Sequence, residues 1–239
     1  MIIGSLPFVI YLQFIHGHKY ALIKDDQIKI FFFMLIIVIL FTTYWLKQYQ
    51  LLDLSNSFRF ALFNITSILT GTGYSNSDYS NWGSFGLIIM LLIMFVGGCA
   101  GSTTGGIKIF RLLLLYRGAK AQIKKITQPH AVLLMRFNGK TVTENTYNSI
   151  MAFFFMYILI FILSAISLSF FNLDFITSLS AAASAISNVG PGIGSEIGPS
   201  GSYASIDSGG KWILAFTMLI GRLEIFTVLI LLSINFWKK

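Results

Sequence analysis

The chain has 239 residues, of which 55% are hydrophobic and only 11% are charged, and its net charge is +8. A soluble globular domain carries roughly 25% charged residues, so this composition excludes an ordinary soluble fold and predicts a membrane protein. The single cysteine, Cys99, excludes an intrachain disulfide and offers no metal-binding spacing. Because Cys99 lies between small residues, we expect it to fill a packing position.

Apolar segments along the chain define the expected helices. Residues 2–15 are apolar but too short to cross a membrane at about 1.5 Å per residue, and they lack the basic flank of a signal peptide. We therefore interpret residues 1–27 as the end of an earlier helix followed by a loop. Windows long enough to span about 30 Å of hydrocarbon, the last of them interrupted, are 28–46, 149–171, 212–232 and 86–116. An all-α, polytopic fold follows.

Two short segments, 58–69 and 175–186, lie between these windows and are too short to cross the membrane. Each has a long apolar helix before it and another after it. This order predicts two repeats of helix, re-entrant hairpin and helix, at residues 28–118 and 149–239, joined by a basic linker at 119–148. Non-helical backbone at membrane depth is tolerated only where protein buries it or water bathes it, so the tip of each hairpin should line a cavity.

The hairpin tips read Thr-Gly-Thr-Gly-Tyr at residues 70–74 and Ser-Asn-Val-Gly-Pro at residues 187–191, 117 residues apart. Gly71 and Gly73 allow left-handed backbone angles that aim successive carbonyl oxygens at one axis. Such oxygens can replace the water shell of a monovalent cation. The absence of carboxylates from both tips disfavours a divalent metal. The alternative is that these glycines only form turns, but their occurrence in two matching hairpins favours a pore.

A glycine-rich run interrupts the window 86–116. Residues 97–106 contain five glycines together with Ser102, Thr103 and Thr104. Each glycine destabilises a helix by about 1 kcal/mol, so the helix should break there. Small-residue helix packing would instead place glycines four apart on one face. A nucleotide-binding loop would need the order G-x-x-x-x-G-K-[S/T], which is not met.

Charged residues inside apolar segments need a structural reason. Arg222 lies in the window 212–232, where an arginine costs about 2.5–3.5 kcal/mol, so it should face the bundle interior or water. A contact between helices is the alternative explanation. Glu224 is only two residues away and would point to another side of a helix, so we expect the two to pair elsewhere. For Asp78 we favour a role in capping the following helix over one in lining the outer mouth.

The distribution of basic residues predicts the orientation. Thirteen of the 17 lysines and arginines lie in residues 16–29, residues 108–140 and the C-terminal tail, which indicates that these segments are cytoplasmic. No aromatic residues are interleaved with this basic stretch as a stacking surface would require, so a nucleic-acid partner is not expected. No paired carboxylates, Ser-His-Asp set or Cys-His set share one compartment, so an enzyme is not expected either.

Four motifs in order carry a resemblance to a known family. They are residues 70–79, the run from Gly97 to Lys108, residues 188–192 and the stretch from Gly221 to Thr227. Over nearly the whole chain the sequence resembles the Trk/Ktr/HKT superfamily of potassium transporters, and within it the bacterial Trk-type potassium-uptake membrane subunit.

The resemblance implies the roles of particular residues. K⁺ is the transported ion, no cofactor is needed, and the ion-binding filter residues are Thr70, Gly71, Thr72, Gly73, Ser187, Asn188, Val189 and Gly190. The resemblance also implies a flexible gating loop below the filter, with Arg222 nearby in the cavity. The loop residues are Gly97, Gly98, Gly101, Ser102, Thr103, Thr104, Gly105 and Gly106.

Members of that family carry four repeats around one pore with pseudo-four-fold symmetry. The two repeats here resemble the third and fourth, so the chain looks like a C-terminal half that needs the missing N-terminal half or a second copy. The resemblance places it in the bacterial cytoplasmic (inner) membrane as a multi-pass protein, with a cytosolic nucleotide-binding regulatory ring on the inner face. The alternative is a nonconducting remnant or an assembly subunit of a split transporter. Channel-like transport and coupling to H⁺ or Na⁺ both remain open.

Overall fold

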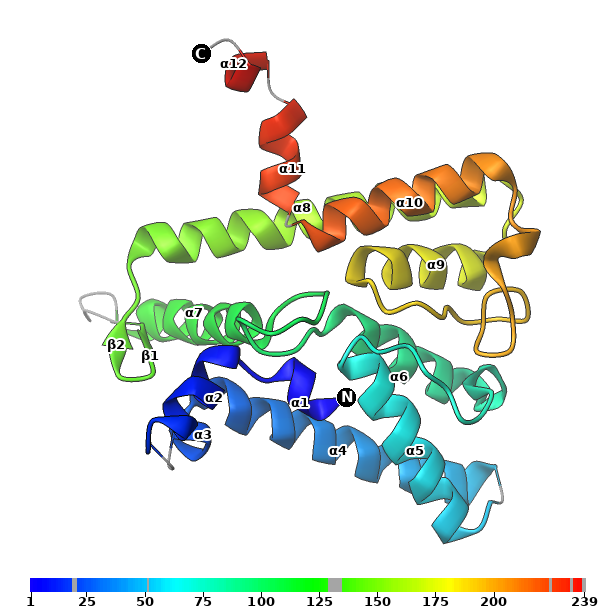
Figure 1. The fold of residues 1–239 in the computed structure, drawn as a ribbon, viewed down its shortest axis with the longest axis horizontal. Helices are drawn as coiled ribbons and strands as arrows, with labels where there is room; N and C mark the ends of the chain where they lie inside the picture. Colours follow the sequence, from blue (N-terminus) through cyan, green and yellow to red (C-terminus); the bar gives the residue numbers. More distant parts are fainter. Residues whose placement is uncertain (19–20, 51, 129–134, 224, 233, 238–239) are drawn as a thin grey trace.

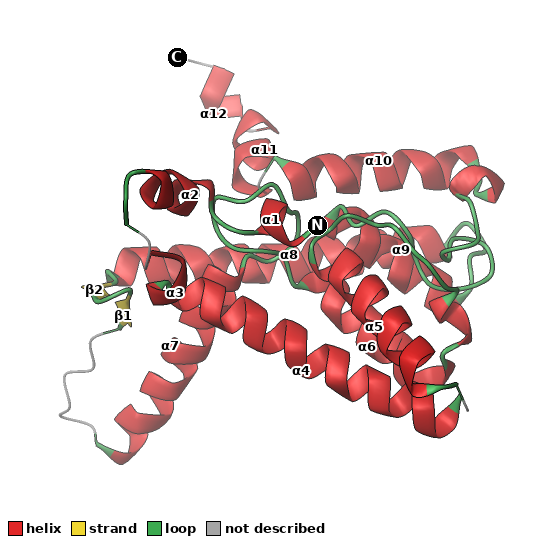
Figure 2. Ribbon diagram, turned by 60° about the horizontal axis from the view of Figure 1, so that its bottom comes forward, coloured by secondary structure: helices red, strands yellow, loops and turns green. Residues whose placement is uncertain are grey.

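The computed structural model describes residues 1–18, 21–50, 52–128, 135–223, 225–232 and 234–237. The protein is mostly helical (Figures 1 and 2). The α-helices are α1 (Ile2–Ser5), α2 (Phe8–Ile15), α3 (Ala21–Lys24), α4 (Asp26–Tyr49), α5 (Leu54–Leu69), α6 (Gly83–Phe95), α7 (Ile109–Thr127), α8 (Glu144–Ser169), α9 (Phe175–Ser187), α10 (Ser208–Arg222), α11 (Ile225–Leu232) and α12 (Ile234–Trp237). Two 3₁₀ turns and one small hairpin complete the described elements: η1 (Tyr79–Asn81), η2 (Tyr203–Ser205), β1 (Arg136–Phe137) and β2 (Lys140–Thr141).

The helices form two groups that share one core. Helix α4 packs against α5 in the first group, and α8, α9 and α10 pack together in the second. Helix α6 contacts both α5 and α9 and so joins the groups, as Figure 1 shows at the centre of the molecule. In each group a long helix is followed by a short one, and a non-helical segment then leads to the next helix. This arrangement brings the C-terminal ends of α5 and α9 into the interior.

Helices α4 and α8 are long and apolar enough to cross a bilayer. On α4 the buried side chains recur at helical spacing, at Phe31, Leu35 and Ile39. Large apolar side chains on the opposite faces are exposed, among them Leu40 on α4 and Phe155 on α8. A continuous exposed apolar surface of this kind marks contact with lipid.

The structure corrects two of the expected helix windows. The window 212–232 is divided, because α10 ends at Arg222 and α11 begins at Ile225; Figure 1 shows α11 turned steeply away from α10. The helix thus ends where the polar side chain of Arg222 interrupts the apolar run. The expected half helix at residues 2–15 is also two short helices, since Pro7 disfavours helical angles at the residue before it. The expected break within 86–116 is present, between Phe95 and Ile109.

The basic linker has more structure than its charge suggests. Helix α7 continues past the expected boundary at residue 118 to Thr127, because its lysines, alanines and glutamine are good helix formers. Helix α8 already begins at Glu144, where the Thr143 hydroxyl accepts a hydrogen bond from the Thr146 N–H. Asn138 and Gly139 both have positive φ, which suits the tight turn between β1 and β2.

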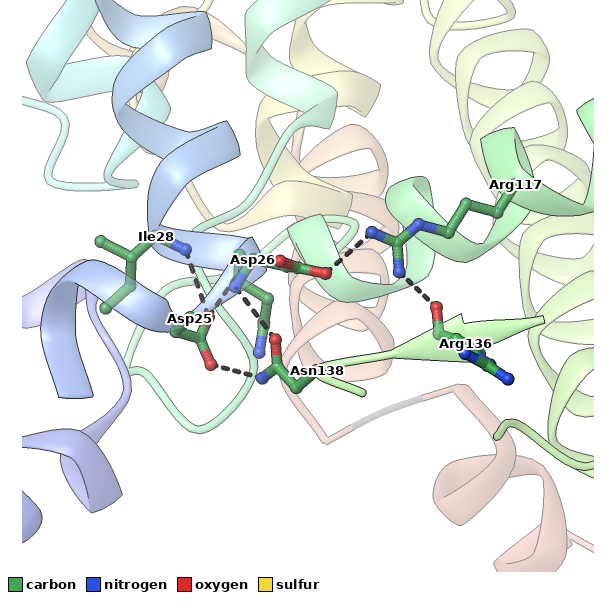
Figure 3. Close-up of polar contacts among 7 residues, drawn as sticks. Asp25, Asp26, Ile28, Arg117, Arg136 and Asn138 are labelled. Atoms are coloured by element: carbon green, nitrogen blue, oxygen red, sulfur yellow. Dashed lines mark hydrogen bonds and ion pairs between the residues drawn. The ribbon is translucent and has the colours of Figure 1, made fainter. Parts of the chain in front are cut away.

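A polar cluster fastens this hairpin to α4 and α7 (Figure 3). The Asn138 side chain donates to Asp25 Oδ2 at 2.8 Å and accepts from the Asp26 N–H at 3.0 Å. Arg117 of α7 forms a 2.8 Å ion pair with Asp26 and also donates to the Arg136 carbonyl. Asp25 meanwhile caps α4 by accepting from the N–H groups of residues 27 and 28. The start of α4 therefore depends on contacts with Arg117 and Asn138, which lie 91 and 112 positions from Asp26.

Replacing Asp25 by alanine should lower the melting temperature of the detergent-solubilised chain more than replacing Asp53 does. Asp53 only caps α5, through the Ser55 N–H, which is worth about 1 kcal/mol. Asp25 caps α4 and also accepts from Asn138, which adds about another 1 kcal/mol. Equal melting temperatures for Asp25→Ala and Asp53→Ala would show that the hairpin contact adds nothing.

Candidate functional site

The first tip, residues 70–74, turns sharply at the end of α5. Gly71 and Gly73 have φ of +62° and +77°, so the left-handed backbone expected at both glycines is confirmed. The Thr70 hydroxyl contacts the Thr66 carbonyl and the Thr72 hydroxyl, each at 2.7 Å. The tip is therefore a defined turn that continues from the helix.

The second tip, residues 187–191, follows the end of α9 and is held by neighbouring helices. Asn188 ends α9 with a φ of +54°, and its side-chain nitrogen donates to the Met218 carbonyl of α10 at 3.1 Å. The Ser187 hydroxyl shares a 2.7 Å hydrogen bond with the Tyr157 hydroxyl of α8. Asparagine tolerates left-handed angles better than most residues with a Cβ, so it replaces glycine here. Sequence reasoning singled out the glycines and missed this turn.

The structure brings the two tips side by side. A Cβ added at Gly73 would lie 2.3 Å from the Val189 carbonyl oxygen, and one added at Gly71 would lie 3.9 Å from the Asn188 carbonyl oxygen. Only a residue without a side chain fits at Gly73. The residues expected to form one filter are thus neighbours in space, although they are more than 100 positions apart.

Most carbonyl oxygens of the two tips are free acceptors. Among the residues that the structure describes, no donor reaches the carbonyl oxygens of Thr70, Gly71, Thr72, Gly73, Ser187, Asn188 and Val189. The Gly190 carbonyl differs, because it accepts from the Tyr203 hydroxyl at 2.8 Å. Thr70, Ser187 and Val189 are buried, and buried backbone carbonyls are nearly always paired, so carbonyls there without a donor among the described residues call for water or a cation.

The glycine loop, residues 97–106, leaves the helical path and returns to it. Its ends are fastened together, since the Gly97 N–H donates to the Ile107 carbonyl and the Ile107 N–H to the Phe95 carbonyl, both at 2.9 Å. Inside the loop the Gly98 N–H donates to the Thr104 hydroxyl at 2.8 Å, and the Ser102 hydroxyl donates to the Cys99 carbonyl.

The glycine loop is also bound to the N-terminal segment, which lies beside it in Figure 2. The Cys99 N–H donates to the Ser5 carbonyl at 2.9 Å, the Thr103 N–H donates to the Gly4 carbonyl, and the Gly101 carbonyl accepts from the Phe8 N–H. Cys99 itself is fully buried, as expected. No sequence signal linked these segments, because the contacts join residues more than 90 positions apart.

The glycine loop lies directly against the second tip. A Cβ at Gly105 would meet the Ser187 carbonyl oxygen at 2.0 Å, and one at Gly106 would meet the backbone of residues 95 and 97 at about 3.1 Å. Arg222 donates to the Thr103 carbonyl at 2.9 Å, so the structure places it at the loop. Residue 224, its nearest acidic neighbour in sequence, lies outside the described residues.

A cavity of about 260 Å³ opens where the glycine loop, α8 and α10 meet. Residues 102–106 line it together with Lys108, Arg111 and Arg222. Lys108 donates to the Thr104 carbonyl and, at 3.0 Å, to the Thr104 hydroxyl. Sequence reasoning quoted Lys108 only as part of a motif; its position just after a glycine run was the signal that could have marked it.

Asp78, which follows the first tip, caps the short turn η1 rather than the long helix α6 that we expected it to cap. Its Oδ1 accepts from the Ser80 N–H at 3.0 Å at the start of η1. Its Oδ2 accepts from the Ser200 hydroxyl at 3.4 Å, which links the segments that follow the two tips.

Replacing Gly73 by serine should lower the ratio of K⁺ to Na⁺ uptake by roughly threefold to tenfold in a complete transporter containing this chain. The added Cβ would displace the Val189 carbonyl, and one lost ligand contact is worth about 1 kcal/mol. Gly139→Ser is the matched control, because Gly139 also has a positive φ but has nothing within 4 Å. An unchanged ratio for Gly73→Ser would argue against a filter at this tip.

Comparisons with known proteins agree with one another over the whole chain. The TrkH family, described as cation transport protein, matches residues 1–239. The Trk system potassium uptake protein TrkI of Halomonas elongata is 40% identical over 239 residues, which is 100% of this chain and 48% of that protein. TrkG of Escherichia coli, also a Trk system potassium uptake protein, is 35% identical over 91% of this chain and 44% of its own length.

A solved structure has a fold similar to that of this chain. The crystal structure of the potassium transporter TrkH from Vibrio parahaemolyticus superposes with a TM-score of 0.91 at 31% identity, over 99% of this chain and 51% of that one. The chain thus spans about half the length of the curated relatives it matches. Together with the exposed apolar surfaces of α4 and α8, these matches support a membrane protein. The chain belongs to the TrkH family of cation transport proteins.

Proposed function

We propose that this chain takes part in K⁺ uptake across the membrane and that its two tips form walls of a carbonyl-lined filter. The observation that carries the proposal is the row of carbonyl oxygens on the two adjacent tips that no donor reaches among the described residues. The ligands are the backbone oxygens of residues 70–73 and 187–190. The names of the relatives, which are potassium uptake proteins, support K⁺ as the ion.

The electrostatics of the tips suit a monovalent cation. Helices α5 and α9 both end at the tips, and a helix C-terminus carries roughly half a negative charge. The tips themselves contain no carboxylate. A divalent metal would need carboxylate ligands to offset the free energy of its dehydration. A dehydrated K⁺ ion can be held by uncharged oxygens and helix ends alone.

We propose that the glycine loop and Arg222 obstruct the path below the filter. Gly105 touches the second tip, and Arg222 is bonded to the loop at Thr103. The Arg222 side chain is exposed and lines the cavity, where its guanidinium repels a cation. A closed gate held by one side chain is a state that a regulator can open.

Replacing Arg222 by alanine should raise K⁺ flux, because the change removes both the positive charge and the bond to Thr103. The measurement is Rb⁺ or K⁺ influx into proteoliposomes containing the complete transporter. Arg59→Ala is the control, since Arg59 is exposed on α5 and has the same charge. Lower flux in a folded and correctly inserted Arg222→Ala protein would favour a purely structural role.

The chain supplies only part of a closed filter. Two tips provide two walls, and the chain covers 48% of one relative and 44% of another. We propose that it works as the C-terminal half of a Trk-type transporter in the bacterial inner membrane, with the N-terminal half or a second copy completing the pore. Because the chain covers less than half of these relatives, a second candidate function is that of a nonconducting remnant or an assembly subunit.

Expression of this chain alone should not restore growth of a K⁺-uptake-deficient bacterium at low external K⁺, whereas co-expression with the first half of a relative should. A partly coordinated K⁺ ion at membrane depth cannot recover its lost hydration energy. Failure of co-expression with properly inserted chains would favour the nonconducting candidate. Rescue by this chain alone would overturn the half-transporter proposal in favour of a pore built from two copies.

A regulatory partner fits the basic end of the molecule. Lys120, Lys124 and Lys125 of α7 are exposed, and the β1–β2 hairpin is fixed to α4 by Asn138 and to α7 by Arg117. We propose that a cytosolic nucleotide-binding regulatory ring docks on this face. Helix α7 begins directly after the glycine loop, so a force on α7 would reach the loop through Lys108.

A further inference from the structure

Gly190 is the one filter residue whose carbonyl oxygen is hydrogen-bonded within the part of the chain that the structure describes. Its N–H donates to the Ser184 hydroxyl of α9 at 3.1 Å, and its carbonyl accepts from the Tyr203 hydroxyl at 2.8 Å. Its φ of +115° is a conformation that residues with a side chain rarely adopt. Both peptide groups that flank the Gly190 Cα are therefore fixed from outside the tip.

Tyr203 is itself held firmly in place. It begins η2, which the Ser202 hydroxyl caps by accepting from the Ala204 N–H. The Lys211 ammonium of α10 donates to the Ala204 carbonyl at 2.8 Å. The tyrosine ring packs against a buried cluster that includes Ile197 and Ile206. Burial raises the pKa of the Tyr203 phenol, so the hydroxyl keeps its proton and remains a donor at neutral and alkaline pH.

Among the described residues, no side chain holds the last filter carbonyl of the first tip in the same way. Gly73 occupies the place in the first tip that Gly190 has in the second, 117 positions later. No side chain among the described residues donates to the Gly73 carbonyl, whereas the Tyr203 hydroxyl binds that of Gly190. Two tips of similar shape therefore differ in how freely their outermost carbonyl can turn.

We infer that Tyr203 is a specificity-determining residue of the filter, because its hydroxyl fixes the orientation of the Gly190 carbonyl. The inference rests on the proposed filter and deepens it. Discrimination between K⁺ and Na⁺ depends on how closely carbonyl oxygens can approach the ion, and the smaller Na⁺ ion needs a closer approach. An oxygen tied to Tyr203 cannot move inward to follow a smaller ion. The hydroxyl thereby disfavours Na⁺ while leaving a lone pair of the oxygen for K⁺.

The chain offers a matched control in Tyr79. Its hydroxyl donates to the Gly192 carbonyl at 3.2 Å, two residues beyond Gly190, and its ring is almost fully buried. In both cases the change of tyrosine to phenylalanine removes one hydroxyl and its hydrogen bond to a carbonyl; at Tyr203 it also removes a contact with the Ser184 hydroxyl. Only Tyr203 acts on a carbonyl of the filter.

The experiment measures K⁺ and Na⁺ uptake in proteoliposomes containing a complete transporter that carries this chain, with Tyr203→Phe and Tyr79→Phe compared with the unchanged protein. Tyr203→Phe should lower the K⁺/Na⁺ uptake ratio by about threefold to tenfold, the range that one hydrogen bond is worth. The fall should come from faster Na⁺ uptake. Tyr79→Phe should leave the ratio unchanged within about twofold.

A second variant, Ser184→Ala, keeps the proposal testable if Tyr203→Phe does not fold. Ser184→Ala removes the acceptor of the Gly190 N–H and so loosens the peptide that carries the Val189 carbonyl. It should lower the ratio in the same direction as Tyr203→Phe does. If neither variant changes the ratio while Gly73→Ser does, the filter stands and the role of Tyr203 is refuted. If Gly73→Ser also leaves the ratio unchanged, the proposed filter itself fails.

Discussion

Backbone polar groups inside a membrane protein must find partners, and this requirement shapes the centre of the molecule. In the first tip the N–H groups of Thr70, Gly71 and Thr72 donate to carbonyls of α5. In the second tip the N–H groups of residues 188, 189 and 190 bind to α9. The carbonyl oxygens beside them have no such partners among the described residues. The tips therefore present carbonyl acceptors that can face a cation.

The lack of side chains at two other glycines joins the filter to the elements beneath it. A Cβ at Gly105 would lie 2.0 Å from the Ser187 carbonyl oxygen, and one at Gly221 would lie 2.0 Å from the Ile186 carbonyl oxygen. The glycine loop and α10 therefore both rest on the last turn of α9. Arg222 follows Gly221 directly and is bonded to the same loop. A movement of the loop would press on the second tip, so the proposed gate and the proposed filter would meet at one short helix.

Local signals in the sequence were enough to predict the features that depend on local chemistry. Gly71 and Gly73 adopt positive φ, and five glycines within ten residues end a helix. Long-range contacts could not be predicted this way. The Ser5 carbonyl fastens the glycine loop, Asn188 ends α9 with a left-handed backbone angle, and Tyr203 reaches back thirteen residues to Gly190. The division of α10 from α11 also depends on where Arg222 finds its partner.

The most direct test of the filter is to locate the bound ion. Crystals of a complete transporter that carries this chain, grown with Tl⁺ or Rb⁺ in place of K⁺, would show the ion by its anomalous scattering. The filter assignment predicts anomalous density beside the carbonyl oxygens of residues 70–73 and 187–190. Density elsewhere, coordinated by side chains, with none between the tips of a protein that still transports K⁺, would contradict it.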